Sequence, residues 1–543
     1  MSVNRGKYRK TVFRMFGKGI GIFLAGIAGI LVLFIVTQLI TQHVWVKNEQ
    51  TSVKELTAEQ KKADFRYLTK LAGNYYPFGR VNVKVKGLED FKAVKEEYIV
   101  RAGKTKDNTE FIKLVNEYLQ RIHQTGHEYV LSKEEAEVFN TFSYRALLKL
   151  KKEDFNKTEY WNNLLYQTTV GTYSDLAIQY NNGGYYLQKD YYLKDLFLQA
   201  GTQITRVNGQ DTDGYVKSLQ NKHWLRFDSF KDKVYISNPF LVDNEDGKTE
   251  WEVEFKLPGG KVVSSPIVKR FGYKLDTRID NNPYNSTFCR ELNDTTGYIR
   301  VYYFPGDYHP DYNIIQDFMK ASGGRYDKLI IDIRGNNGGN TDYWKKVFVE
   351  PLMKEVTYDE REVSLSKKYF EDYKMELNIF KATGGGLFHK NSGFVSAKRI
   401  RSDNPYGRGM FTFKVTRVFY PKNTFPFDGK VYLLVDHDCF SAAEDFAGAV
   451  KDMKLATIVG SNTQGGMATL LNSVPFALPE SGIMFAFETD MSYNQDGTVN
   501  EVYGTKPDVE LETSSYPTAY PLSDKTEDLR KDPWISWVIN YVD

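Results

Sequence analysis

The sequence predicts an α/β protein with a largely parallel sheet. From about residue 296 onward, short apolar segments alternate with helical ones, which is the pattern of strand–helix–strand units. The chain has 543 residues, of which 41% are apolar, so several domains with sizeable cores can form. Residues 19–46 carry no formal charge apart from any on His43, and basic residues precede them. These observations together predict an N-terminal membrane anchor followed by a folded α/β part.

The uncharged segment is long enough for a transmembrane helix. Its centre, IGIFLAGIAGILVLFIVTQLI, approaches the length that spans a bilayer. The preceding basic residues predict a cytoplasmic N-terminus, with everything after about residue 46 outside. A cleaved signal peptide is the alternative, but the apolar run is long for one and no small-x-small site follows. We therefore expect residues 1–47 to be a cytoplasmic stub and a single-pass anchor in the cell membrane.

The next region, residues 48–150, is predicted to be mostly helical. Its clearest helix has an apolar stripe from Phe111 to Ile122, and Asp107 with Glu110 resembles a capping box at its start. Residues 178–275 instead show short strands and turns. Within them, GTQITRVNGQDTDGYVKSLQ predicts a strand, an Asn-Gly turn and a helix.

Composition excludes some classes of function. The net charge is +3, from 72 basic and 69 acidic residues, which gives no electrostatic argument for nucleic-acid binding. The two cysteines, Cys289 and Cys439, show neither metal-binding nor CxxC spacing, and they could pair or stay free. No metal or cofactor is implied.

The C-terminal half supplies the strands of the predicted sheet. The segments TGYIRVYYF, KLIIDI, VYLLVD and ATIVG indicate strands, and DYNIIQDFMKA indicates a helix between the first two. Residues 355–425 are less regular and include three consecutive glycines, which suggests an insertion.

A glycine-rich turn follows KLIIDI. It reads Arg334-Gly-Asn-Asn-Gly338-Gly-Asn340 and lies where ligands bind in open α/β sheets, at the carboxyl edge of the strands. A phosphate loop is one interpretation, but no Lys-Ser/Thr pair follows and the spacing fits no dinucleotide motif. A tight turn without function is the second interpretation. Half of an oxyanion hole is the third.

Ser441 is the candidate nucleophile. It follows a buried-strand pattern, KVYLLVDHDCF, and begins the helix-like segment SAAEDFAGAVKD. A serine at such a junction lies among the free N–H groups at the positive end of a helix, which suits a nucleophile and a developing oxyanion. A simple serine N-cap is the alternative.

Three segments together resemble the tail-specific, or C-terminal-processing, serine protease family: IDIRGNNGG, the CFSAAEDFAGAVKD segment and VGSNTQGG. The resemblance implies a crotonase-like α/β protease core over residues 280–543. It also implies an oxyanion hole from the N–H groups of Gly338 and Ala442. More weakly, GTQITRVNGQ resembles the family's PDZ-like module, which we place at residues 178–275.

The chain departs from the better-known branch of this family, which uses a Ser-Lys dyad. The lysine would lie in a GKG turn, but the sequence here is Gly465-Gly466-Met467. The tricorn-type branch uses Ser, His and Glu instead. Similarity of QRIHQTGHEYVL to its Gly-His segment implies that His127 is the general base. Similarity of NEVYGTKPDVEL to its acidic segment implies that Glu501 orients the histidine.

Other side chains compete for these roles. His309 and His437 are alternative bases, and His437 precedes Ser441 by four residues. Asp496 and Asp508 lie close to Glu501, although Asp508 is better explained by a structural role.

The function expected from the sequence is that of a membrane-anchored, extracytoplasmic serine endopeptidase. It would hydrolyse a polypeptide substrate through an acyl-enzyme on Ser441. An inactive scaffold that binds partners through the PDZ-like module is the alternative favoured by the missing lysine. An acyl-CoA enzyme of the crotonase type is a third possibility, opposed by the serine after the strand and by the PDZ-like module.

Overall fold

A computed structural model gives the fold of the chain. The structure describes residues 53–86, 94–122, 127–169, 286–373, 394–467, 473–511 and 528–541, and most of 174–268. Contacts divide the chain into two units, Met1–Val53 and Lys54–Asp543. All helices and strands named below belong to the second unit. The predicted anchor, residues 1–47, lies outside the described residues, and no helix within the described part is long and apolar enough to cross a bilayer.

The core of the second unit is a six-stranded sheet, which confirms the predicted α/β alternation. Its order is β12-β13-β14-β18-β19-β23; β12 runs antiparallel to β13, and the other neighbours are parallel. Each strand segment predicted for this region coincides with a strand of the sheet. The bounds are β12 Thr287–Asn293, β13 Thr296–Val301, β14 Lys328–Asp332, β18 Lys430–Val435, β19 Thr457–Gly460 and β23 Val509–Glu510.

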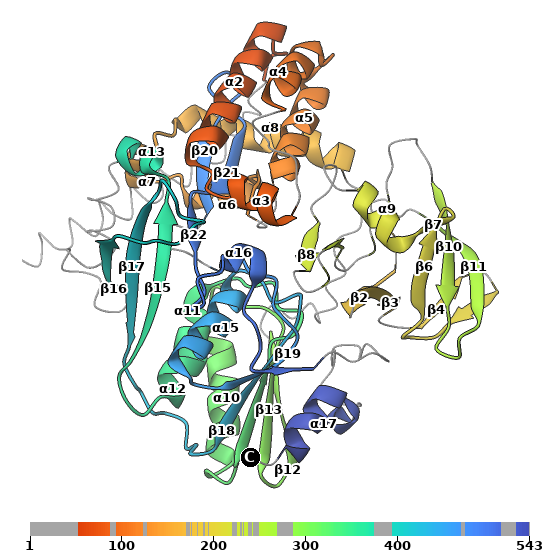
Figure 1. Ribbon diagram of the computed structural model, residues 1–543, viewed down its shortest axis with the longest axis vertical. Helices are drawn as coiled ribbons and strands as arrows, with labels where there is room; N and C mark the ends of the chain where they lie inside the picture. Colours follow the sequence, from red (N-terminus) through yellow and green to blue (C-terminus); the bar gives the residue numbers. More distant parts are fainter. Residues whose placement is uncertain are drawn as a thin grey trace, which may run out of the picture. The chain divides into compact units, whose positions relative to one another are not determined.

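Both faces of this sheet are covered by helices. On β14, Leu329 and Ile331 join a large apolar cluster with α10, α11, α12 and α15, while Ile330 joins a smaller cluster with α17 on the opposite face. This alternation is what a strand buried on both faces requires. Figure 1 shows α17 on one side of the strands and α10 and α12 on the other. The helices are α10 His309–Ala321, α11 Thr341–Trp344, α12 Glu350–Leu352, α15 Ala442–Met453 and α17 Pro533–Asn540.

A second sheet supports α15 from outside the core. Its order is β16-β17-β15-β22, and three of its strands come from the segment predicted to be an insertion. Arg361 on β15 and Arg417 on β17 both form ion pairs with Asp445 of α15, at 3.0 and 2.8 Å. The three consecutive glycines of this segment, residues 384–386, lie outside the described residues. The bounds are β15 Thr357–Leu365, β16 Phe394–Ile400, β17 Phe411–Phe419 and β22 Asp490–Ser492.

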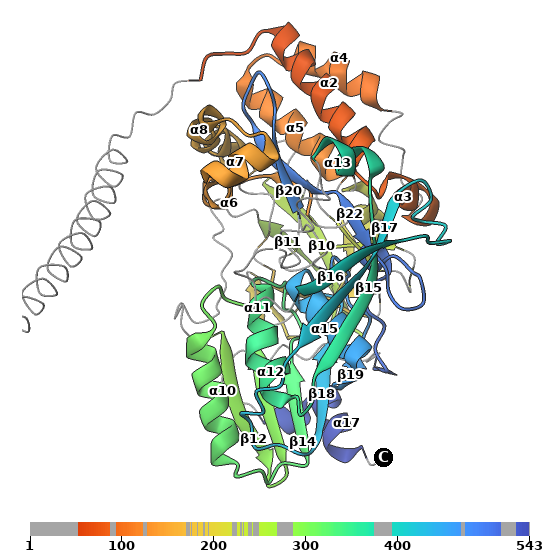
Figure 2. The ribbon, with the colours of Figure 1, turned by 90° about the vertical axis from the view of Figure 1, so that its left-hand side faces the viewer.

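The N-terminal part of the unit is helical and packs on a hairpin from the core. The predicted stripe helix is α5, and Asp107 accepts the N–H of Glu110 at its start, at 2.8 Å. The hairpin β20–β21 packs against this helical part, as Figures 1 and 2 show. Its strand β21 pairs with β1. The helices are α2 Ala58–Tyr75, α3 Gly79–Lys86, α4 Lys95–Lys104, α5 Asn108–Ile122, α6 Lys133–Val138, α7 Phe142–Leu148 and α8 Lys152–Thr169; the strands are β1 Tyr129–Val130, β20 Ser473–Ala477 and β21 Met484–Glu488.

Residues 174–268 form a small module around a third sheet, β11-β10-β6-β3-β2. The predicted strand–turn–helix is present, with Asn208 and Gly209 at positive φ between β6 and the short strand β7, followed by α9. The module has its own apolar cluster around Trp251 and Phe255. The elements of the sheet and its helix are β2 Ile178–Asn181, β3 Gly184–Leu187, β6 Gln203–Val207, β7 Gln210–Asp211, α9 Thr212–Ser218, β10 Glu250–Lys256 and β11 Val262–Val268. Two separate hairpins complete the module. The first pairs β4 Tyr191–Leu193 and β5 Leu196–Leu198, and the second pairs β8 Arg226–Asp228 and β9 Lys233–Tyr235.

Candidate active site

Ser441 lies at the junction between β18 and α15. The strand ends at Val435, residues 436–440 form a loop, and α15 begins directly after the serine. Ser441 has φ 58° and ψ −119°, a conformation that non-glycine residues rarely adopt and that is common at functional sites. Ser441 occupies the N-cap position of α15, but its side chain makes no capping hydrogen bond there. The Oγ atom lies 3.1 Å from Nε2 of His127 instead.

His127 connects Ser441 to a buried carboxylate. Its Nδ1 lies 2.7 Å from Oε1 of Glu488. The Glu488 side chain is 1% exposed and the His127 side chain 17% exposed, so the carboxylate is buried while the imidazole is partly accessible to solvent. A hydroxyl at one ring nitrogen and a carboxylate at the other is the arrangement that lets an imidazole accept a proton from the hydroxyl.

A short strand pairing brings His127 and Glu488 together. Tyr129 of β1 lies opposite Ala486 of β21, in antiparallel register. Extending this register by two residues brings His127 opposite Glu488. Ser473 of β20, which pairs with Glu488 from the other side, donates its hydroxyl to the His127 carbonyl at 2.8 Å. The backbone therefore fixes both members of the pair.

The acidic residue beside the histidine differs from the one expected. No hydrogen bond or ion pair among the described residues joins Glu501 to His127; its Oε1 accepts the N–H and hydroxyl of Ser492, at 2.9 and 2.7 Å. Burial, and then the charge of Glu488, raise the pKa of Glu501 well above its ordinary value, which favours its neutral form. The residue against Nδ1 is Glu488, and the expectation for Glu501 is corrected accordingly.

The two neighbouring aspartates have local roles. Asp496 is exposed and accepts the N–H of Thr498 at 2.9 Å. Asp508 accepts the N–H of Ile458 on β19 at 2.9 Å, so its structural role is as expected.

The two rival histidines lie elsewhere. His309 is exposed and pairs with Asp307 at 2.8 Å. His437 is buried, and its carbonyl accepts the hydroxyl of Tyr235 from β9 at 2.7 Å, which connects the 174–268 module to the serine loop. Within the described part of the chain, His127 is the histidine that hydrogen-bonds Ser441.

Gly338 packs directly against the serine. A Cβ atom built on it would lie 2.7 Å from the Ala442 nitrogen and 2.7 Å from the Phe440 oxygen. Its N–H, however, donates to Oδ1 of Asn336 at 2.8 Å, so in this structure it is not directed at an oxyanion. The Ala442 N–H, at the start of α15, has no acceptor among the described residues, as the first N–H groups of a helix usually lack one. Of the two expected oxyanion donors, the Ala442 N–H is therefore unengaged among the described residues and the Gly338 N–H is held by Asn336, and their role stays a prediction.

Gly338→Ala is expected to lower kcat on the order of 10²-fold, because displacing a catalytic group by about 1 Å can cost that much. The glycine has φ 99° and no room for a methyl group. Gly209→Ala is the matched control, since Gly209 has φ 79° with nothing within 4 Å of the added carbon. Peptide hydrolysis and thermal unfolding would be measured for both. Equal losses of activity in the two variants would show that only backbone strain matters.

Comparison with known proteins identifies the core. Residues 295–511, which contain the glycine turn and Ser441, match peptidase family S41. This core belongs to peptidase family S41. The chain is accordingly a serine peptidase that acts on polypeptides.

Two solved structures of CPAF share the fold of this chain. Mature CPAF complexed with lactacystin superposes with a TM-score of 0.54 at 12% identity, over 84% of this chain and 94% of that one. Mature CPAF alone gives 0.53 at 11% identity, over 84% and 93% of the two chains. The photosystem II D1 C-terminal processing protease gives 0.39 at 15% identity, over 85% and 95%.

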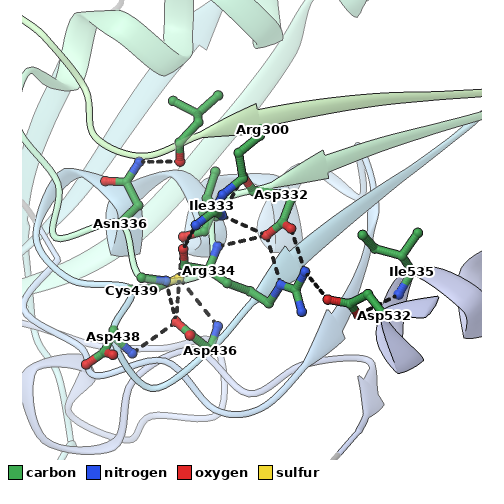
Figure 3. Close-up of polar contacts among 12 residues, drawn as sticks. Arg300, Asp332, Ile333, Arg334, Asn336, Asp436, Asp438, Cys439, Asp532 and Ile535 are labelled. Atoms are coloured by element: carbon green, nitrogen blue, oxygen red, sulfur yellow. Dashed lines mark hydrogen bonds and ion pairs between the residues drawn. The ribbon is translucent and has the colours of Figure 1, made fainter. Parts of the chain in front are cut away.

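Direct hydrogen bonds connect the glycine turn of the peptidase to the serine loop. The Gly335 N–H donates to Oδ1 of Asp436 at 2.8 Å, and the Phe440 N–H donates to the Asn336 carbonyl at 3.1 Å. Cys439 is a free thiol whose Sγ contacts the Ile333 carbonyl at 3.1 Å, and Cys289 is also free. Figure 3 shows Asp436 and Cys439 near the end of β14, with the Asp438 N–H donating to Asp436 Oδ1. The two loops therefore form one rigid unit.

A buried ionic network holds the base of the glycine turn. Arg334 contacts Asp332 at 2.7 Å and Asp532 at 2.8 Å, and Arg300 contacts Asp332 at 2.9 Å (Figure 3). Burial raises the pKa of Asp332, but the charges of Arg300 and Arg334 outweigh it and bring the pKa to about 2. Asp532 also caps α17 by accepting the N–H of Trp534 at 2.9 Å. Helix α17 and the glycine turn are thus joined through one carboxylate.

The environment of His127 favours the neutral ring. Burial lowers the pKa of His127 to about 4, with the charge of Glu128 acting in the opposite direction. A neutral imidazole is the form that can accept the proton of Ser441.

In the described residues, no three His, Cys, Asp or Glu side chains gather as metal ligands.

Proposed function

We propose that the peptidase is a membrane-anchored, extracytoplasmic endopeptidase that cleaves peptide bonds through an acyl-enzyme on Ser441, with His127 as general base. The observation that carries this proposal is the 3.1 Å contact between Nε2 of His127 and Oγ of Ser441. The 2.7 Å contact of Nδ1 with Glu488 supports it, because a carboxylate there holds the proton on Nδ1 and leaves Nε2 free to accept.

The reaction has two halves. Ser441 Oγ attacks the substrate carbonyl while His127 Nε2 takes the hydroxyl proton, and Glu488 stabilises the resulting imidazolium. The tetrahedral intermediate collapses, the C–N bond breaks, and the imidazolium gives its proton to the leaving amine. Water then attacks the acyl-serine ester while His127 takes its proton; the bond to Ser441 Oγ breaks, the imidazolium returns the proton to Oγ, and the carboxylic acid product leaves. The Ala442 N–H at the start of α15 would stabilise the oxyanion in both halves.

A fluorophosphonate probe tests the nucleophile. The wild-type peptidase should be labelled at Ser441, Ser441→Ala should not be labelled, and His127→Ala should react far more slowly because the hydroxyl loses its base. Peptide mapping of the labelled protein identifies the site. An unlabelled wild-type protein that is folded would favour the scaffold alternative.

The anchor is a separate part of the proposal, supported by the uncharged segment at residues 19–46 and its basic flank. Protease added outside intact cells is expected to digest the large C-terminal part and to leave a tag at the N-terminus intact. Antibodies against the tag and against the core would follow the two parts on a blot. Protection of the core in intact cells, with digestion after lysis, would reverse the proposed orientation.

We also propose that residues 178–275 act as a PDZ-like module that binds substrate chains. The five-stranded path β11-β10-β6-β3-β2 with α9 supports this, since peptides add to sheet edges by strand pairing or insert a terminal carboxylate. The module's Tyr235 contact with His437 would bring bound chains close to the serine loop.

A further inference from the structure

An aromatic ring lies beneath the imidazole of His127. The ring of Phe440 stacks on it, with centroids 4.6 Å apart and planes inclined by 28°. Phe440 is also the residue directly before Ser441 in the chain. The side chain of Phe440 therefore contacts the proposed base, and its backbone is bonded directly to the proposed nucleophile.

The backbone of Phe440 is fixed from three directions. Its N–H donates to the Asn336 carbonyl at 3.1 Å, and its carbonyl accepts the Ala443 N–H at 3.1 Å. It also forms an isolated parallel bridge with Gly465. The backbone of Phe440 therefore cannot shift without disturbing the glycine turn, the start of α15 or the 461–467 segment.

Gly466 lies against the same ring. Its φ is 76°, and a Cβ atom built on it would lie 2.1 Å from Cε2 of Phe440. No side chain fits at position 466 while the ring of Phe440 keeps its place. By the resemblance described above, this turn carries the base in the lysine-using branch. In this peptidase the phenyl ring occupies that space, and the stacked imidazole lies on it.

We propose that Phe440 is a positioning residue for His127, and that residue 466 is glycine because the phenyl ring needs the space. The inference rests on the proposed role of His127 as general base. The ring holds the imidazole in the plane in which Nε2 meets Ser441 and Nδ1 meets Glu488. It also covers one face of the imidazole and so contributes to the burial that lowers the pKa of His127.

Phe440→Leu tests the inference. We expect kcat to fall on the order of 10²-fold with little change in KM, because the base loses its alignment while substrate contacts stay. The acidic limb of the kcat/KM profile should move to higher pH, toward the ordinary histidine value of about 6.5, as water reaches the ring. Phe440→Tyr keeps the flat ring and should retain the wild-type profile. If Phe440→Leu does not fold, Phe440→Met provides the same comparison.

Phe446→Leu is the matched control. Phe446 lies on α15 and stacks on Trp344 and Phe348, away from the imidazole. Its replacement should lower the melting temperature and leave the acidic limb unchanged. A Phe440→Leu enzyme with wild-type kcat and an unmoved acidic limb would overturn the inference.

A double-mutant cycle separates this inference from the proposed function. In a His127→Ala background, Phe440→Leu should cause no further loss, because a positioning residue acts only through the group it positions. A further loss there would show that Phe440 acts independently of the histidine and would also overturn the inference. Full activity of His127→Ala alone would instead reject the proposed base.

Discussion

Ser441→Ala is expected to lower kcat by about 10⁶-fold, and His127→Ala by nearly as much, because the members of a catalytic triad act as a unit. The two side chains are joined by one 3.1 Å contact, so removing either leaves the other without its function. The double variant should be no slower than the slower single variant. Hydrolysis of a peptide substrate by purified, folded variants measures these losses.

His309→Ala and His437→Ala are the controls for this result. His309 is exposed and contacts Asp307, and the His437 carbonyl, rather than its ring, accepts the hydrogen bond from Tyr235. Both variants should keep substantial activity. An active His127→Ala enzyme combined with an inactive His309→Ala or His437→Ala enzyme would show that a different histidine is the base.

The second large effect is expected at Glu488. Glu488→Gln keeps the size of the side chain but removes the charge, and its amide can present an N–H to Nδ1 and so stabilise the wrong tautomer. In a well-studied serine protease the equivalent change costs roughly 10⁴ in kcat, and we expect a loss of that order here. Steady-state kinetics at neutral pH, with unfolding curves for each variant, would measure it.

Glu501→Gln is the matched control for Glu488→Gln. Glu501 is buried, and burial with the charge of Glu488 raises its pKa toward the neutral form, which an amide resembles in shape and hydrogen-bonding capacity. Its Oε1 contacts to Ser492 can be kept by the amide oxygen. Activity close to wild type is expected. A loss at Glu501 with full activity at Glu488 would restore the assignment made from the sequence and contradict the one made from the geometry.

The strands of the core were predictable because they are buried on both faces. Segments such as KLIIDI and VYLLVD have near-continuous apolar composition, and their alternation with helices implies parallel pairing. The second sheet was not predictable. Its strand β15, TYDEREVSL, carries Asp359 and Arg361 where a core strand would carry apolar residues. These charges are buried in ion pairs with residues far along the chain, such as Arg361 with Asp445, and a local pattern does not reveal such partners.

Ser441 was proposed from its local junction together with the resemblance of three segments, whereas the carboxylate that contacts His127 was not anticipated. The Glu501 assignment depended on similarity of a segment, whereas the choice between carboxylates depends on the register of β1 with β21. One signal was present in the sequence: Glu488 ends the apolar run IMFAFE, and a carboxylate in a buried strand needs a partner. A second signal was local: Asn336 lies two residues before Gly338, and its Oδ1 accepts the Gly338 N–H as asparagines commonly do in turns.

The pairing of β1 with β21 has a consequence for biosynthesis. The proposed base comes from residue 127, the proposed nucleophile from 441, the carboxylate beside the base from 488, and the helix that supports the glycine turn from 533–540. A ribosome releases these pieces in that order, so a nascent chain holds the histidine long before its partners exist. The proposed site therefore cannot be complete before residue 488 has left the ribosome, and a shorter nascent chain lacks the carboxylate that contacts His127.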